Sequence, residues 1–160
     1  MIRRFACTTL LLAAAMAAPS ALSGQLKFGI HGARAVDIHG GANGLGASLE
    51  LSFPVFPVDL FAAGDYFFPD CGDGDGCSFR GGSLDLHFGL PFPVVQPYGA
   101  AGLVVRQADQ GDALGRVTHR GFGVGVGVNL GAVVIGGYAE ARYEFVDPDD
   151  QFVLRLGIRF

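Results

Sequence analysis

The chain has 160 residues, of which 11 are basic and 15 are acidic, so its formal net charge is −4. This acidic balance argues against nucleic-acid binding, which needs a basic surface. Half of the residues are hydrophobic and 26 are glycine, and regular hydrophobic residues between the glycines argue against a disordered chain.

The first 23 residues have the features of a secretory signal peptide. Arg3 and Arg4 form a basic start, Leu10–Ala18 is apolar, and small residues lead up to Ser23. We expect cleavage after Ser23, which leaves 24–160 as one mature domain with a formal charge of about −6. The apolar run is about half the ~20 residues that a spanning helix needs, so no helical anchor is expected.

Eight later segments alternate between apolar and polar or small residues, with the period of two that a β-strand imposes. Helical spacing fits none of them better. The fifth is ambiguous, because YGAAGLVV is apolar on both faces. Eight strands of about 9–11 residues leave enough chain for the connections. The segments lie at about 25–35, 45–53, 58–68, 80–90, 98–107, 121–130, 133–145 and 152–160.

The connections alternate in composition. Polar connections are expected near 37–44, 69–79, 108–120 and 146–151, and short or Pro-rich ones at 54–57, 91–97 and 130–133. Proline fits strand ends because it cannot donate to a ladder. This pattern predicts outer loops at one end of a barrel, periplasmic turns at the other and an aromatic girdle at each end. The predicted girdle residues are Phe53, Phe56, Phe92, Tyr98 and Phe160 at the lower end and Tyr66, Phe68, Tyr143, Phe145 and Phe152 at the upper end.

One polar connection contains two cysteines. Cys71 and Cys77 flank GDGDG, and nearby cysteines in an exported protein usually pair, so we expect a disulfide. A cation site from Asp70, Asp73 and Asp75 is the alternative, but the calcium-loop pattern fails because Cys77 stands where a third ligand is needed. No metal or cofactor is predicted, and the sequence leaves cation binding by the 70–75 loop open.

The chain ends in FVLRLGIRF, which is apolar on one face and carries Arg155 and Arg159 on the other. The apolar face is formed by Phe152, Leu154, Leu156, Ile158 and Phe160. This ending resembles the last strand of bacterial outer-membrane β-barrels, in which such a face and a terminal Phe are the signal that the barrel assembly machinery recognises. Taken with the export signal and the eight segments, the chain resembles the family of small OmpA/OmpX-like outer-membrane proteins.

The resemblance implies an all-β fold, an eight-stranded antiparallel up-and-down transmembrane barrel in the bacterial outer membrane. It also implies a monomer in contact with outer-membrane lipid, delivered by periplasmic chaperones to the barrel assembly machinery. A soluble lipocalin-like barrel is the alternative, and it would turn the apolar faces inward and the charges outward.

Apolar faces that meet lipid require the charged faces to point inward. The interior of an eight-stranded barrel is only wide enough for side chains, so the charges must pair. We expect Arg155 to lie beside the stretch from Glu140 to Glu144, and the glycines at 121, 123, 125 and 127 to leave room for arginines from across the barrel. The inward charges predicted by this parity are Lys27, Glu50, Asp59, Asp85, Glu140, Arg142, Glu144, Arg155 and Arg159.

Three functions fit such a chain: a structural or surface-interaction protein with a side-chain-filled lumen, a narrow porin-like channel for ions or small solutes, and a lipid-modifying enzyme. We favour the first and predict no enzyme. A serine nucleophile needs a histidine and an acid within reach. The His-x-Ser pattern of lipid A deacylase barrels fails at His119, and the spacing of His39, Asp75 and Ser78 is not diagnostic. We expect His31 and His87 to be lumen residues rather than ligands.

Overall fold

The computed structural model describes residues 26–36, 41–53, 58–69, 78–90, 92, 94–109, 116–131, 135–148 and 150–160. The predicted signal peptide, the two loop cysteines Cys71 and Cys77 and the Asp-rich 70–75 loop lie outside these residues.

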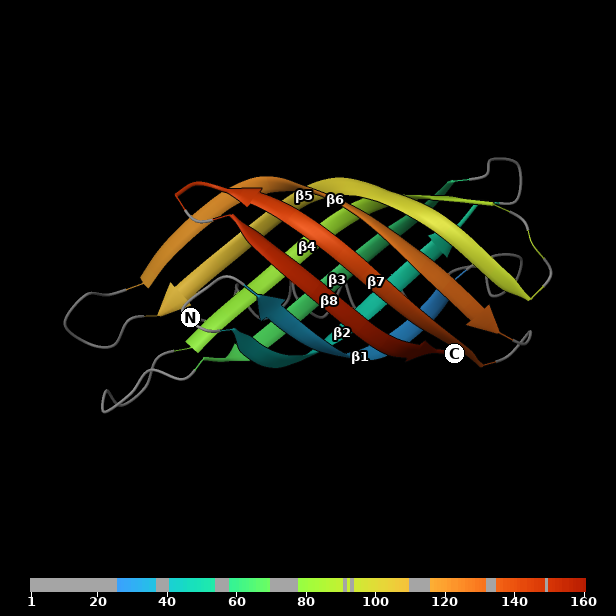
Figure 1. Cartoon of the computed structure of the whole chain (residues 1–160), viewed down its shortest axis with the longest axis horizontal. Helices are drawn as coiled ribbons and strands as arrows, with labels where there is room; N and C mark the ends of the chain where they lie inside the picture. Colours follow the sequence, from blue (N-terminus) through green and yellow to red (C-terminus); the bar gives the residue numbers. More distant parts are fainter. Residues whose placement is uncertain are drawn as a thin grey trace, which may run out of the picture.

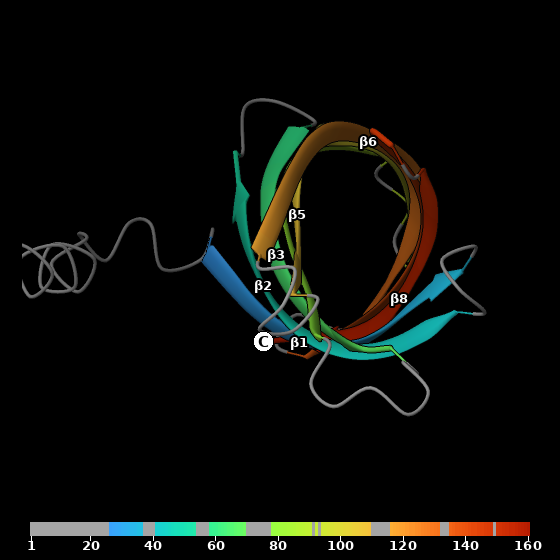
Figure 2. The same cartoon turned by 90° about the vertical axis from the view of Figure 1, so that its left-hand side faces the viewer.

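Eight antiparallel strands form a closed barrel in which each strand pairs with its neighbours in sequence and β8 pairs with β1 (Figures 1 and 2). The predicted eight-stranded up-and-down topology is therefore confirmed. None of the described residues forms a helix long and apolar enough to cross a membrane. The strands are β1 (Leu26–Val36), β2 (Ala42–Ser52), β3 (Val58–Phe68), β4 (Ser78–Gly89), β5 (Val95–Asp109), β6 (Arg116–Gly131), β7 (Gly136–Val146) and β8 (Gln151–Arg159).

The barrel closes where the chain ends. Phe160 and Phe28 exchange two backbone hydrogen bonds, of 2.8 Å and 2.9 Å, just beyond the last residue of β8. The start of β1 and the end of β8 therefore lie at the same end of the barrel, which we call the terminal end. The opposite end is called the loop end.

Several strand boundaries differ from the prediction by a few residues, most of all at the two ends of β5 and at the start of β6. The segment 108–120 was expected to be a loop, but β5 and β6 remain paired as far as Asp109 and Arg116. Polar residues extend this hairpin, and Gln107 donates a 3.2 Å hydrogen bond to Thr118. The polar residues of this segment indicated a loop, but polar side chains are equally compatible with a strand whose surface is exposed to water. At the terminal end, Pro97 lies inside β5 opposite Val128 rather than in a linker.

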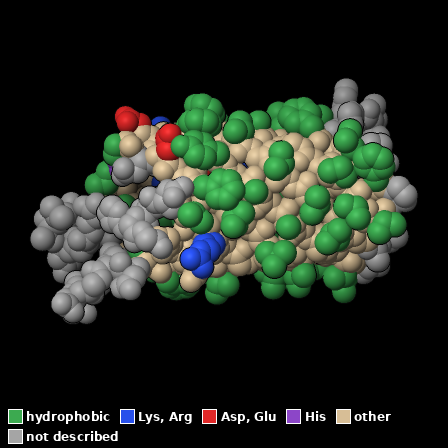
Figure 3. All heavy atoms as spheres, viewed as in Figure 1, with side chains coloured by type: hydrophobic (Ala, Val, Ile, Leu, Met, Phe, Trp, Pro, Cys, Tyr) green, Lys and Arg blue, Asp and Glu red, His purple; other side chains and the backbone are tan. Residues whose placement is uncertain are grey.

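Side-chain direction follows the predicted parity. Large apolar side chains cover the outside of the barrel, as the hydrophobic surface in Figure 3 shows. The ambiguous fifth segment turns Leu103 and Val105 outward and Val104 and Arg106 inward. Tyr98 shares the inward parity and is buried, so its predicted place in the lower girdle is wrong.

Candidate functional site

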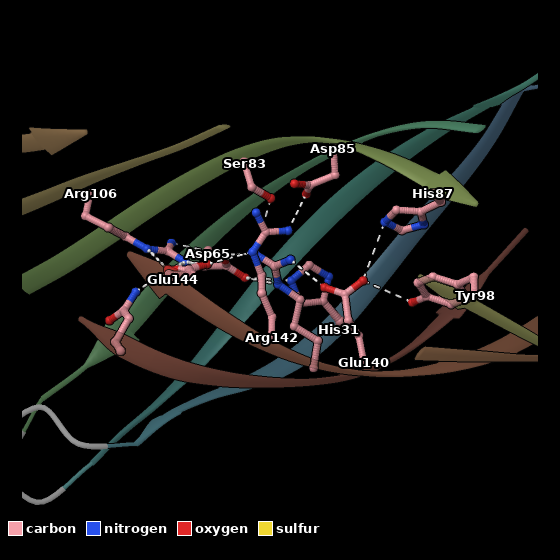
Figure 4. Close-up of polar contacts among 12 residues, drawn as sticks. His31, Asp65, Ser83, Asp85, His87, Tyr98, Arg106, Glu140, Arg142 and Glu144 are labelled. Atoms are coloured by element: carbon pink, nitrogen blue, oxygen red, sulfur yellow. Dashed lines mark hydrogen bonds and ion pairs between the residues drawn. The ribbon is translucent and has the colours of Figure 1, made fainter. Parts of the chain in front are cut away.

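The interior of the barrel is the candidate site, because it gathers most of the charged side chains of the strands. At the loop end it holds a small apolar cluster of Ala33, Ala35, Ala42, Phe67 and Val153, with Phe79 packed against it. Below this cluster lies a layer of ion pairs, and toward the terminal end lies a layer of aromatic rings. Figure 4 shows the ion pairs and part of the aromatic layer.

Arg106 joins the apolar cluster to the ion pairs. Its guanidinium carbon lies 5.7 Å from the centre of the Phe67 ring and 5.9 Å from that of Phe79. Its Nε donates a 2.8 Å hydrogen bond to Glu144 Oε2, and its Nη1 donates one of 3.3 Å to Asp65 Oδ2. This arginine therefore links carboxylates on β3 and β7, which face each other across the interior.

Arg155 binds a second pair of carboxylates. Its Nη2 donates a 2.7 Å hydrogen bond to Asp65, and its Nη1 donates one of 3.0 Å to Glu140. His31 Nε2 lies 2.8 Å from the other oxygen of Asp65. Side chains from β1, β3, β7 and β8 therefore meet in one cluster of contacts. Arg155 is opposite Glu140 in the ladder, the neighbourhood that hairpin pairing suggested.

Arg142 completes the charged layer. Its Nη1 lies 2.7 Å from Asp85 Oδ2, and its Nε lies 3.2 Å from Glu144 Oε1. Glu144 also accepts a hydrogen bond from Gln151. The side chains of Arg142, Asp85 and Glu144 are fully buried.

The aromatic layer surrounds a histidine. His87 stacks between Phe61 and Tyr98, with ring centres 4.4 Å and 4.5 Å away. Tyr98 donates a 3.0 Å hydrogen bond to Glu140, which connects this layer to the charged layer. Tyr138 lies edge-on to Phe61, with ring centres 6.2 Å apart.

Arg159 and Glu50 close the terminal end. The Arg159 guanidinium lies over the Tyr138 ring at 4.1 Å from its centre and pairs with Glu50. Lys27 reaches the same carboxylate at 2.9 Å, but its side chain is 48% exposed, so it lies at the mouth of the barrel. Asp59 is also at this mouth and is half-buried.

The carboxylates and the arginine and lysine side chains that form ion pairs in the interior and at its mouth are equal in number. Five carboxylates, Glu50, Asp65, Asp85, Glu140 and Glu144, pair with Arg106, Arg142, Arg155, Arg159 and Lys27, and the half-buried Asp59 at the mouth is outside this count. A buried charge without a partner would cost several kcal/mol. The balance and the shared hydrogen bonds explain how so many charges can coexist in this narrow space.

Glycines make room for the large interior side chains. A Cβ added at Gly123 would collide with the Arg142 guanidinium, lying 2.7 Å from its Cζ. A Cβ at Gly127 would collide with the Tyr98 ring. The side chains that use this space come from the adjacent strands β7 and β5, not from across the barrel as we predicted, and one of them is a tyrosine.

Two central members of the charged layer were absent from the predicted cluster. Asp65 already had the inward parity in the sequence, so that parity was sufficient to include it. Arg106 was missed because both faces of the fifth segment are apolar up to Val105. The predicted charges include five acids, Asp59 among them, but neither Asp65 nor Arg106.

The residues considered for catalysis or metal binding do not form a site in the described structure. His31 contacts Asp65, and His87 lies between aromatic rings with Glu140 at 3.5 Å. His119 lies on β6 opposite Arg106, and His39 and Asp75 lie outside the described residues. No group of three or more potential metal ligands occurs among the residues that the structure describes.

The barrel is closed and antiparallel, its outside is apolar, and its interior is charged and filled with side chains. This is the fold of small eight-stranded outer-membrane barrels. No known family model and no curated protein matches the sequence. Solved structures do match. The N-terminal β-barrel domain of Pseudomonas aeruginosa OprF is 18% identical, with a TM-score of 0.69 over 86% of this chain and 96% of that chain.

Two further solved structures have the same fold. Neisserial surface protein A is 18% identical, with a TM-score of 0.64 over 84% of this chain and 94% of that one. Ail, the attachment invasion locus protein of Yersinia pestis, is 14% identical, with a TM-score of 0.61 over 85% of this chain and 97% of that one. The chain is thus similar in fold to small outer-membrane barrels along nearly their whole length.

Proposed function

We propose that this chain is an integral outer-membrane protein whose lumen is closed by its own side chains, with a structural or surface-interaction role. The apolar outside supports the membrane location. Leu103, Val126 and Leu156 are 66%, 67% and 71% exposed on the outer surface, and soluble monomers rarely expose continuous apolar surface on this scale.

The observation that supports a closed lumen is a connected set of side-chain contacts that crosses it. Arg106 and Arg155 tie Asp65 on β3 to Glu144 and Glu140 on β7. Each tie runs between opposite sides of the barrel, so a continuous path for ions would require buried ion pairs to separate. Breaking such a pair typically costs about 3–5 kcal/mol.

Planar-bilayer recording tests this proposal. Protein whose folded state has first been verified by gel mobility should give no steady unit conductance at neutral pH. Regular unit steps would support the narrow-channel alternative and contradict the closed lumen. Prior verification of folding ensures that a silent bilayer reflects a closed barrel rather than unfolded protein.

We also propose that the chain is exported by means of a cleaved signal peptide, that the barrel assembly machinery recognises the β8 face, and that the protein is a monomer. The β8 side chains Leu154, Leu156 and Ile158 form a continuous apolar face on the outer surface, and this face supports the proposed recognition. An enzymatic role would be indicated by a changed lipid profile on overexpression, and we expect the profile to be unaltered.

A further inference from the structure

The outer surface carries a set of unpaired arginines near the loop end. Arg34 on β1, Arg80 on β4 and Arg120 on β6 are exposed on the outside of the barrel. None of the three forms an ion pair with another described residue. Charged atoms visible on the face shown in Figure 3 lie in its left half, away from the end where β8 finishes.

The outward charges that the structure describes on the strands are of one sign. Among the strand residues whose side chains the structure describes, no aspartate or glutamate points outward, because the carboxylates face the lumen or its mouth. Asp147 and Asp150 lie beyond the end of β7, where Asp150 accepts a 3.2 Å hydrogen bond from the Val146 amide. On the described strands the outward charges are therefore arginines, and the nearest described carboxylate on the outer face is Asp150 at the β7–β8 turn, which accepts a 3.3 Å hydrogen bond from the Tyr143 hydroxyl.

The three arginines lie at one height. Following the strand pairings around the barrel, and allowing for strand tilt, Arg34, Arg80 and Arg120 fall within about two residues, or roughly 5 Å along the axis. Three aromatic side chains of the predicted upper girdle share this level, as does Phe122, which the prediction did not include: Tyr66, Tyr143, Phe152 and Phe122. The Arg80 guanidinium lies 5.9 Å from the centre of the Tyr66 ring.

A level marked by aromatic side chains is where an apolar barrel surface meets lipid headgroups. Basic side chains near a membrane surface attract anionic lipid. We propose that Arg34, Arg80 and Arg120 form a belt that binds the phosphates of anionic lipid headgroups in the leaflet at the loop end. This inference rests on the proposed membrane location and specifies which lipids surround the barrel.

The test compares spin-labelled phosphatidylglycerol with spin-labelled phosphatidylcholine around the protein in phosphatidylcholine vesicles. The wild-type protein should prefer the anionic lipid, by about fivefold at a site beside one arginine. The variant R34Q/R80Q/R120Q should lose the preference, and R34K/R80K/R120K should keep it. Arg116→Gln, which removes an arginine well above the girdle, should leave the preference unchanged.

Equal association of both lipids with wild-type protein would overturn the belt, as would a preference that survives in the glutamine variant. If that variant does not fold, salt dependence decides, because the preference should fall at high salt and an unchanged one would contradict the proposal. Failure of the wild-type protein to insert into vesicles would instead refute the proposed function.

Discussion

Replacing Arg155 with methionine should strongly destabilise the barrel. Methionine fills a similar space but leaves Asp65 and Glu140 without the guanidinium that lies 2.7 Å and 3.0 Å from them. The ion-paired set would then hold five carboxylates and four arginine or lysine side chains. Removing one partner of a buried pair costs about 3–5 kcal/mol, so the free energy of unfolding should fall by that amount.

The assay is equilibrium urea unfolding in zwitterionic vesicles, with the β-sheet circular dichroism and gel mobility as independent probes. The matched control Arg120→Met removes an exposed arginine and should change stability by about 0.5 kcal/mol or less. In the double variant R155M/D65N the charges balance again, so it should recover part of the loss, with a coupling energy of about 1 kcal/mol or more. A loss for Arg155→Met no larger than that of the control would refute the reasoning.

Two further variants test the inside and the outside of the barrel. Gly123→Ala should cost about 1–3 kcal/mol of stability by overpacking against Arg142. The control Gly32→Ala should be nearly neutral, because nothing lies within 4 Å of a Cβ added there. Equal effects of the two variants on stability would contradict the packing argument. Leu156→Lys, near mid-height on the outside, should cost about 2–4 kcal/mol in vesicles, whereas Thr118→Lys, above the girdle, should cost little. A neutral Leu156→Lys would indicate a surface that faces water.

Most of the fold could be predicted because a barrel strand has one rule, alternation, and this chain follows it closely. Glu50, Asp85 and Arg142 fall on inward faces for that reason alone. The rule fails where both faces are apolar, which hid Arg106 and led to the wrong position for Tyr98. Alternation also does not locate the end of a strand whose two faces are both polar, which is why the β5–β6 hairpin is longer than expected.

The partners of the interior charges were harder to predict than their direction. Arg155 and Glu140 are ladder neighbours, so hairpin pairing suggested their proximity. The contacts of Asp65 with Arg106 and Arg155 join strands that are not adjacent. Such contacts depend on how the barrel curves and on side-chain length, and neither is visible in the alternation of one sequence.

The most direct test of the account is the state of the full chain expressed in a Gram-negative bacterium. The protein should fractionate with the outer membrane and migrate differently on gels when unheated than after boiling, because a closed barrel resists the detergent until it is heated. A soluble product whose mobility does not change on boiling would contradict the membrane barrel, and with it the lipid-facing surface and the arginine belt.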